Sequence, residues 1–276
     1  MYLITPYKDW ENLEKMGFTR SVAYPWALTG IFGAVHLIIT LIPYNLSVGG
    51  GGEISFGLVS APIIGFLLGP FFGVIAVLIG SFLALFINPL IAILGPFTVI
   101  ATAAGAFAAG AMRTRIRISI PIVFVLAMVI FLISPVGVLV PTFIWFHFIT
   151  FLVSLLFLIP NISSRLIKPL NLTIDTERWV RFVSIWLFSL VAVTLDQVVG
   201  SAIGGWYFVL LGTDATVMAG FFELVIVLYA FERLVGSILV AVIIFALVEG
   251  LSRADYGLPL SRIGQFELLE LSEEEI

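Results

Sequence analysis

The chain contains no cysteine and only two histidines among its 276 residues. The absence of cysteine excludes disulfides, thiolate metal sites and cysteine nucleophiles. The two histidines, His36 and His147, are far apart in the sequence, and there is no H-E-x-x-H motif. We therefore expect neither a metal site nor the chemistry of a zinc hydrolase.

Nucleotide and nucleophile motifs are also missing. The chain has no G-x-x-x-x-G-K-[ST] sequence, and the four glycines at residues 49–52 are not followed by lysine. It therefore cannot bind ATP through a P-loop. No G-x-S-x-G elbow occurs either. The sequence predicts that the protein is not an enzyme, and that it uses no cofactor and no nucleic-acid partner.

Charged residues are scarce as well. They make up 11% of the chain, whereas hydrophobic residues make up 61%. A soluble domain carries about 25% charged residues. Lipid must therefore be the solvent for most of this surface, and we expect an all-α, polytopic helical membrane protein.

Glycine and proline divide the apolar sequence into candidate spans, each of which needs about 20 residues to cross a bilayer. Eight spans are predicted, at residues 22–43, 54–69, 71–87, 89–112, 118–140, 142–160, 179–210 and 219–250. Residues 54–69 and 71–87 are short, so a re-entrant hairpin is an alternative there. The last two stretches exceed the bilayer, so each is expected to protrude, tilt or break.

The basic residues set the orientation of this arrangement. Twelve of the 13 Lys and Arg residues fall on one face, and the thirteenth, Arg233, lies well inside an apolar stretch. By the positive-inside rule that face is cytoplasmic. We predict a multi-pass protein of the cell membrane with both termini in the cytoplasm. Residues 1–20 would be an interfacial segment, residues 21–252 one transmembrane domain, and residues 253–276 an acidic tail.

The polar side chains within the spans gather in the outer half of the membrane. An ionisable group inside a membrane costs roughly 2.5–3.5 kcal/mol, so it is a functional candidate. A proton relay would need such groups across the full thickness, whereas a site for an external solute would cluster them near the outer mouth. The candidate substrate-binding residues are Asp196, Gln197, Arg233, Glu232, Trp206, Tyr207, His36 and His147.

These residues suggest specific roles. Arg233 would neutralise an anionic or carbonyl group, Asp196 and Gln197 would hydrogen-bond polar edges, and Trp206 and Tyr207 would stack on a ring. The glycine-rich residues 45–53 would act as a lid. Asn45 also begins a glycosylation sequon.

Structural explanations compete with each of these roles. Asp196 and Arg233 would also suit an intramembrane ion pair, because buried charges need partners. His36 would suit a packed and hydrogen-bonded position. Trp206 and Tyr207 would suit the aromatic belt at a membrane interface.

Small residues recur at helical spacing and predict close helix contacts. Ala23 and Ala27 are four apart, as are Gly30 and Ala34. Such small-xxx-small patterns let helix backbones approach in lipid. Residues 89–112 are richer still in alanine and glycine. Either internal packing or contact with a partner membrane subunit would explain them.

Three segments carry a resemblance to a known family. Residues 54–73, with a short helix, a Gly-Pro turn and a further glycine, resemble the second and third helices of the substrate-binding S components of energy-coupling-factor (ECF) transporters. Residues 196–201 and 232–237 are similar to that family's last two helices. The Ala23 and Ala27 pair resembles its first-helix alanine motif, which contacts the coupling subunit.

The resemblance implies a membrane subunit that binds a vitamin-like micronutrient from outside and has no ATPase of its own. It would act with a transmembrane coupling subunit and ATPase subunits. Members of the family usually have six spans, so the pair within residues 118–160 would be additional. Two rivals are a non-catalytic structural subunit of a larger membrane complex, and a secondary transporter that uses a proton at Asp196 or Glu232.

Overall fold

The computed structural model describes residues 23–42, 55–170 and 176–253. The predicted interfacial segment, the lid at residues 45–53, the sequon at Asn45 and residues 254–276 of the tail lie outside this part of the chain. The described residues are helical, as expected for an all-α protein. The helices are α2 (Ala23–Thr40), α3 (Gly57–Ile87), α4 (Thr98–Ala111), α5 (Ser119–Leu132), α6 (Trp145–Leu156), α7 (Pro160–Ile167), α8 (Arg178–Leu210), α9 (Ala215–Leu224) and α10 (Leu228–Arg253).

Within the part of the chain that the structure describes, four helical stretches are long and apolar enough to cross a membrane: Gly57–Ile87, Arg115–Leu132, Arg178–Leu210 and Leu228–Gly250. A fifth span results if Pro141–Leu156 and Pro160–Leu170, which meet at 93°, count as one. Eight spans are not shown. One reason is that α4 is only about 21 Å long at 1.5 Å per residue, which is shorter than the hydrocarbon core of a bilayer.

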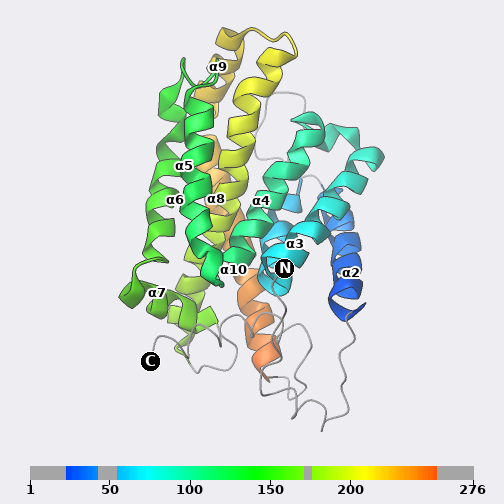
Figure 1. Ribbon diagram of the computed structural model, residues 1–276, viewed down its shortest axis with the longest axis vertical. Coiled ribbons are helices and arrows are strands. Elements are labelled where there is room, and N and C mark those ends of the chain that lie inside the picture. The colour runs from blue at the N-terminus through cyan, green and yellow to red at the C-terminus, as the bar shows by residue number, and fades with distance from the viewer. Residues whose placement is uncertain (1–22, 43–54, 171–175, 254–276) are drawn as a thin grey trace.

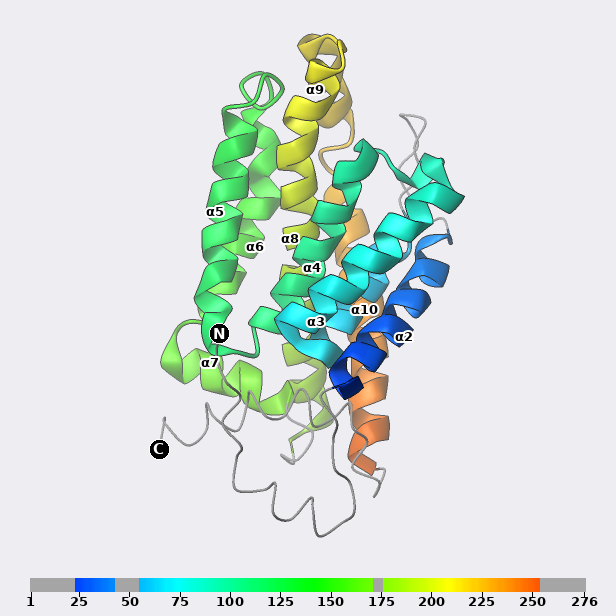
Figure 2. The same ribbon diagram turned by 45° about the vertical axis from the view of Figure 1, so that its right-hand side comes forward.

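Of the alternatives predicted for the last apolar stretch, which were protrusion, tilt or a break, the structure shows a break. Residues 219–250 are divided between α9, which ends at Leu224, and α10, which begins at Leu228. The preceding stretch is instead one continuous helix, α8, about 50 Å long at 1.5 Å per residue. Helix α9 lies at one end of the molecule and α7 at the other (Figure 2).

Helix α3 reverses direction at Gly69. This glycine has φ 78° and ψ 179°, and Pro70 follows it. A Cβ atom on Gly73 would lie 2.8 Å from the Cα of Gly65, although these residues are eight apart in the sequence. In a straight helix they would be about 12 Å apart. The two halves of α3 therefore lie side by side, with the first half only about 18 Å long.

The reversal depends on backbones that touch. A Cβ on Gly65 would lie 2.0 Å from the carbonyl oxygen of Ala106 in α4, and one on Gly110 would lie 2.3 Å from the nitrogen of Pro70. Alanine-rich α4 is consequently buried along most of its length. The structure thus shows internal packing for the alanines and glycines within residues 89–112.

Arg113 completes the turn at Pro70. In a continuous helix the carbonyl of Phe66 would accept the N–H of residue 70, but proline has none. The guanidinium of Arg113 donates to this carbonyl instead, and it lies 4.3 Å from the centre of the Phe66 ring. Its charge also suits the negative end of a helix dipole. Arg113 is therefore a buried cap as well as one of the basic residues that set the predicted orientation.

His36 connects α2 to both halves of α3. Its Nδ1 lies 2.7 Å from the Oγ of Ser60, and its Nε2 lies 2.8 Å from the Oγ of Ser81. The Ser60 hydroxyl also donates to the carbonyl of Gly57. Ser60 then accepts from Nδ1–H, and Ser81 donates to Nε2, which assigns one neutral tautomer to the ring.

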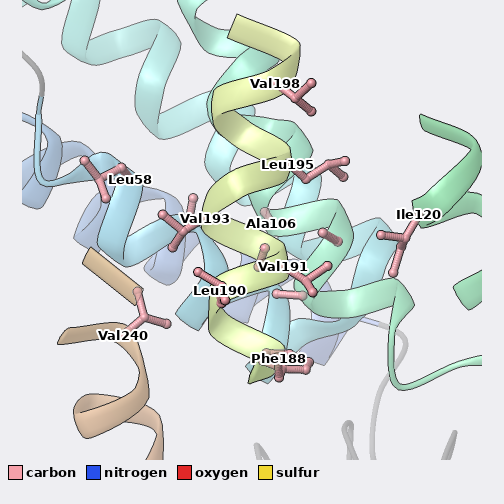
Figure 3. Close-up of a cluster of buried hydrophobic side chains, with 14 of the residues drawn as sticks. Leu58, Ala106, Ile120, Phe188, Leu190, Val191, Val193, Leu195, Val198 and Val240 are labelled. Carbon is pink, nitrogen blue, oxygen red and sulfur yellow. The ribbon is translucent and has the colours of Figure 1, made fainter. Parts of the chain in front are cut away.

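Helix α8 is the centre of the bundle. Its residues from Phe188 to Asp196 are all buried, so this helix has no exposed face in its middle. Figure 3 shows Leu190, Val193 and Val198 pointing from it in different directions toward neighbouring helices. A helix that is buried on every side must be surrounded by other helices. Here it is surrounded by α3, α4, α5, α6 and α10.

The close contact at Gly65 predicts a large asymmetry between two glycine substitutions. We expect Gly65→Ala to lower the free energy of unfolding by about 3 kcal/mol or more, because overpacking against an immovable backbone is costly. Gly30→Ala is the matched control, since a Cβ there meets nothing within 4 Å. Thermal unfolding in detergent measures both. Equal midpoints for the two variants would contradict the packing described.

The His36 contacts predict energetic coupling between His36 and Ser81 of α3. We expect His36→Leu and Ser81→Ala each to cost about 1–2 kcal/mol, because each leaves a buried hydrogen-bonding group without its partner. The double variant should cost less than the sum of the single ones, since one bond is removed in both. Simple additivity in thermal unfolding would reject this contact.

Candidate functional site

A cavity of about 450 Å³ lies among α4, α8, α9 and α10. This volume suits a small organic molecule. Most lining side chains are apolar, and the polar ones include two carboxyls and one guanidinium. The lining residues are Ser55, Leu58, Ile91, Ile93, Leu94, Thr98, Ala101, Thr102, Phe143, Asp196, Gln197, Gly200, Ser201, Gly204, Phe208, Val217, Met218, Phe221, Phe222, Val225, Tyr229, Glu232 and Arg233.

The structure brings together four of the predicted site residues. Asp196 and Gln197 come from the middle of α8, and Glu232 and Arg233 come from the first turns of α10. Asp196, Glu232 and Arg233 are buried within the protein. All three line the cavity and are shielded from the outer surface of the bundle.

The guanidinium of Arg233 is the electrostatic centre of this site. It lies within electrostatic range of the Asp196 carboxyl, the His147 ring and the Tyr229 hydroxyl. Its Nε has no hydrogen-bond partner among the described residues. A buried donor of this kind is costly unless it is satisfied, so it is available to an acceptor on a bound molecule.

Small residues of α4 let α8 come close to this centre. A Cβ on Gly105 would lie 3.3 Å from the Cβ of Asp196. Next along α8, the Gln197 amide donates to the Ser201 hydroxyl over 3.3 Å, and that hydroxyl donates to the Gln197 carbonyl over 2.8 Å. The polar groups of α8 are therefore held in position by their own helix.

Helix α9 forms an apolar wall of the cavity. Phe222 packs against Phe143, with ring centroids 4.7 Å apart, and against Phe131 at 5.6 Å. Asp214 caps the helix by accepting the Thr216 N–H over 2.7 Å. The hydrogen bonds from Thr216 hold the pKa of Asp214 below its usual value, so the cap is ionised at neutral pH.

The two histidines are not among the cavity-lining residues. His36 is satisfied by two serines, which agrees with the packing explanation for it. His147 is fully buried behind the cavity wall, where its ring stacks on Tyr229 with centroids 5.2 Å apart. Neither ring nitrogen of His147 has a hydrogen-bond partner within the described residues.

Trp206 and Tyr207 also lie outside the cavity lining. The indole N–H of Trp206 donates to the carbonyl of Ile130 in α5 over 3.0 Å. Tyr207 packs edge-on against Phe97 and covers the turn at Gly95, where φ is +55°. These two aromatics join α8 to its neighbours, and the rings that line the cavity are Phe143, Phe208, Phe221, Phe222 and Tyr229.

The small residues of α2 are on the surface. Ala27, Gly30 and Ala34 are exposed, and a Cβ on Gly30 would meet nothing within 4 Å. Ala23 begins the helix, and its side chain is not described. Exposed Ile31 and Ile38 continue the apolar surface of this helix.

The sequence reasoning missed a second charged cluster at the other end of α8. Arg181 is buried there, and its Nη1 lies 2.5 Å from a carboxylate oxygen of Glu249 in α10. Its Nε donates to the carbonyl of Pro169. The sequence could have indicated this ion pair, because Arg181 is one turn into α8 and Glu249 is one turn before the end of α10. The structure shows that these two helices are in contact.

The three comparisons with known proteins identify no relative. No family model matches the chain, and no curated protein or solved structure matches it either.

The Trp206 contact predicts a structural role for this residue. We expect Trp206→Phe to lower the free energy of unfolding by about 1 kcal/mol, because the Ile130 carbonyl loses its donor. Solute affinity should stay unchanged, since the indole is not part of the cavity lining. Thermal unfolding and a binding assay on the same preparation separate the two effects. A drop in affinity without a change in stability would restore the stacking role.

Proposed function

We propose that this protein is a membrane-embedded solute-binding subunit of an energy-coupled, ECF-type uptake system for a micronutrient. The observation that carries the proposal is the cavity, in which Asp196, Gln197, Glu232 and Arg233 meet inside an otherwise apolar lining. Cavities with few polar groups and many apolar ones are typical of small-molecule sites. Buried charges in a membrane protein are expensive to keep and are usually functional.

The orientation follows from charge. Helix α7 and the start of α8 lie at the end of the bundle away from α9 (Figure 1), and these two segments contain Arg165 and Arg178. Under the positive-inside rule this end is cytoplasmic and the α9 end faces outward. The protein is then a multi-pass protein of the cell membrane with cytoplasmic termini, and its cavity receives solute from outside.

Energy for uptake would come from partners. The sequence has no P-loop, so ATP hydrolysis requires separate ATPase subunits and a transmembrane coupling subunit. The exposed surface of α2 at Ala27, Gly30 and Ala34 supports such a contact, because small residues let a second helix approach closely. The same surface favours the rival, a structural subunit of a larger membrane complex. Co-purification with an ATPase supports the transporter, whereas co-purification with another assembly supports the rival.

Arg233 tests the proposal. We expect mass spectrometry of gently purified wild-type protein to detect a bound small molecule, which is lost from Arg233→Ala. Removal of a buried ligand-pairing charge costs 2 kcal/mol or more, which is about a 30-fold loss of affinity. Arg165→Ala, at an exposed position on α7, is the control.

The stability of the Arg233 variants decides whether a loss of bound molecule reflects lost binding or lost folding. Arg233→Lys keeps the charge near Asp196 and should fold with an unfolding midpoint near that of the wild type, while binding less tightly because its donor geometry differs. Unchanged affinity in a folded Arg233→Ala protein would reject the assignment.

A further inference from the structure

Helix α7 turns away from the bundle at about a right angle. The stretches Pro141–Leu156 and Pro160–Leu170 meet at 93°, so α7 runs across the direction of α6. It lies at the end of the molecule away from α9, near the start of α8 (Figure 2). Because α8 is long and apolar enough to cross a membrane, a helix at this angle and level runs along the membrane surface.

One face of α7 is fixed to the bundle. Ile167 and Leu170 are buried, and the short 3-10 turn η5 (Lys168–Leu170) packs against α8. The Nε–H of Arg181 in α8 donates to the carbonyl of Pro169 over 3.2 Å. These contacts hold the helix in place, so its opposite face has a fixed orientation.

The opposite face of α7 combines apolar and basic side chains. Ile162, Arg165 and Lys168 are exposed and follow one another at intervals of three residues, which places them along one side of the helical turns. Ile159, just before the helix, is also exposed. Helices that lie in a membrane interface have this composition, with apolar groups at the acyl boundary and basic groups at the headgroups.

The first turn of α8, the helix that η5 contacts, supplies an exposed aromatic group. Trp179 is 72% exposed, and its ring stacks on Phe182 with centroids 6.2 Å apart. Tryptophan is enriched where membrane and water meet, because its ring is apolar and its N–H is polar. We call the following set of exposed residues the interfacial surface: Ile159, Ile162, Arg165, Lys168 and Trp179.

The interfacial surface lies in a basic region of the chain. Residues 159–170 and 176–182 contain four basic side chains and one acidic one, Glu177. Neither Arg165 nor Lys168 forms a salt bridge with an acidic residue among those that the structure describes. An anionic headgroup at this surface would therefore meet an excess of positive charge.

The two basic residues of α8 in this region have a different role. The Nη1 of Arg181 lies 2.5 Å from one carboxylate oxygen of Glu249 in α10, and the Nε of Arg178 lies 3.7 Å from the other. These contacts join the start of α8 to the end of α10. Arg165 and Lys168 are consequently the residues whose charge can be changed without breaking an ion pair within the described part of the protein.

We propose that the interfacial surface binds the headgroups of anionic phospholipids, with Ile159, Ile162 and Trp179 at the acyl boundary and Arg165 and Lys168 at the phosphates. Lysine and arginine reach headgroups while their stems lie along apolar groups. Each basic residue of such a cluster contributes about fivefold in affinity for anionic lipid. This inference depends on membrane insertion of α8 and is independent of the solute-binding function.

Lipid selectivity tests the role of charge. Native mass spectrometry of the full chain in detergent, with equal amounts of phosphatidylglycerol and phosphatidylcholine, measures which lipid stays bound. We expect the wild type to retain phosphatidylglycerol in preference. Arg165→Gln combined with Lys168→Gln should lower the affinity for phosphatidylglycerol by about tenfold or more and leave that for phosphatidylcholine unchanged.

The matched control keeps both charges. Arg165→Lys combined with Lys168→Arg should retain phosphatidylglycerol as the wild type does, because the attraction depends on charge near the membrane surface. Both positions are exposed, so the thermal unfolding midpoints of the two double variants should stay near that of the wild type.

The position of α7 is tested separately with a single introduced cysteine, since the chain has none of its own. Spin labels are placed at Ile162→Cys and, as a reference, at Leu126→Cys on the exposed side of α5. In nanodiscs, collisions are measured with oxygen, which concentrates in the acyl region, and with a nickel chelate, which stays in water. We expect the label at residue 126 to meet oxygen alone and the label at residue 162 to meet both.

Three results would overturn the proposal. Equal retention of the two lipids by the wild type, or an affinity for phosphatidylglycerol that is unchanged in the glutamine double variant, would reject the headgroup site. A preference that arises only after removal of residues 267–276 would mean that the acidic end of the chain, and not lipid, occupies the surface. A label at residue 162 that meets the nickel chelate alone would reject the interfacial position of α7.

Discussion

Close approach of helix backbones in a lipid environment is the constraint on which this structure depends. Where Gly65 meets Ala106 and Gly110 meets Pro70, no side chain separates α3 from α4. This contact lets α3 fold back on itself at Gly69, and it leaves α4 free to lie against α8 beside Asp196. Because there is little hydrophobic drive between helices in lipid, such packing and a few hydrogen bonds must hold the bundle. The bonds from His36 and from Arg113 are examples, and each satisfies a polar group near the reversal.

The cavity exists because the helices around it are interrupted. The last apolar stretch is broken between α9 and α10, and residues 89–97 form short 3-10 turns before α4. Each interruption withdraws a length of helix from the bundle, and the side chains on either side line the space that results. The polar side chains of α8 and α10 therefore border the cavity and are not enclosed entirely by apolar groups. Two ends of the bundle thus differ in kind: Arg181 and Glu249 form a direct ion pair at one, whereas Asp196 and Arg233 border an open volume at the other.

Several features were predictable from the sequence because they depend on local chemistry. Composition indicated an all-α chain with membrane-spanning helices, and Gly69 with Pro70 indicated a break, because proline has no N–H and glycine accepts a positive φ. The grouping of Asp196, Gln197, Glu232 and Arg233 followed from their equal depth along neighbouring apolar stretches. Trp206 and Tyr207 show the limit of this reasoning. Their position along the chain suggested the same depth as the cavity residues. Depth along a helix, however, does not say which side of α8 a residue occupies, and these two lie on a side that faces other helices.

The sequence by itself indicated apolar helices compatible with a membrane, a scarcity of charges and the break at Gly69 and Pro70, since these follow from composition and from the conformations of single residues. Only the tertiary structure decided which helices touch. It placed His36 between two serines of α3, used Arg113 to replace a missing N–H, and put Phe143 and Phe222 in the wall of the cavity. Among the described residues it shows four long apolar helices, or five if the bent pair counts as one span. These outcomes depend on contacts between residues far apart in the chain, and no local pattern encodes which of many apolar surfaces will pack together.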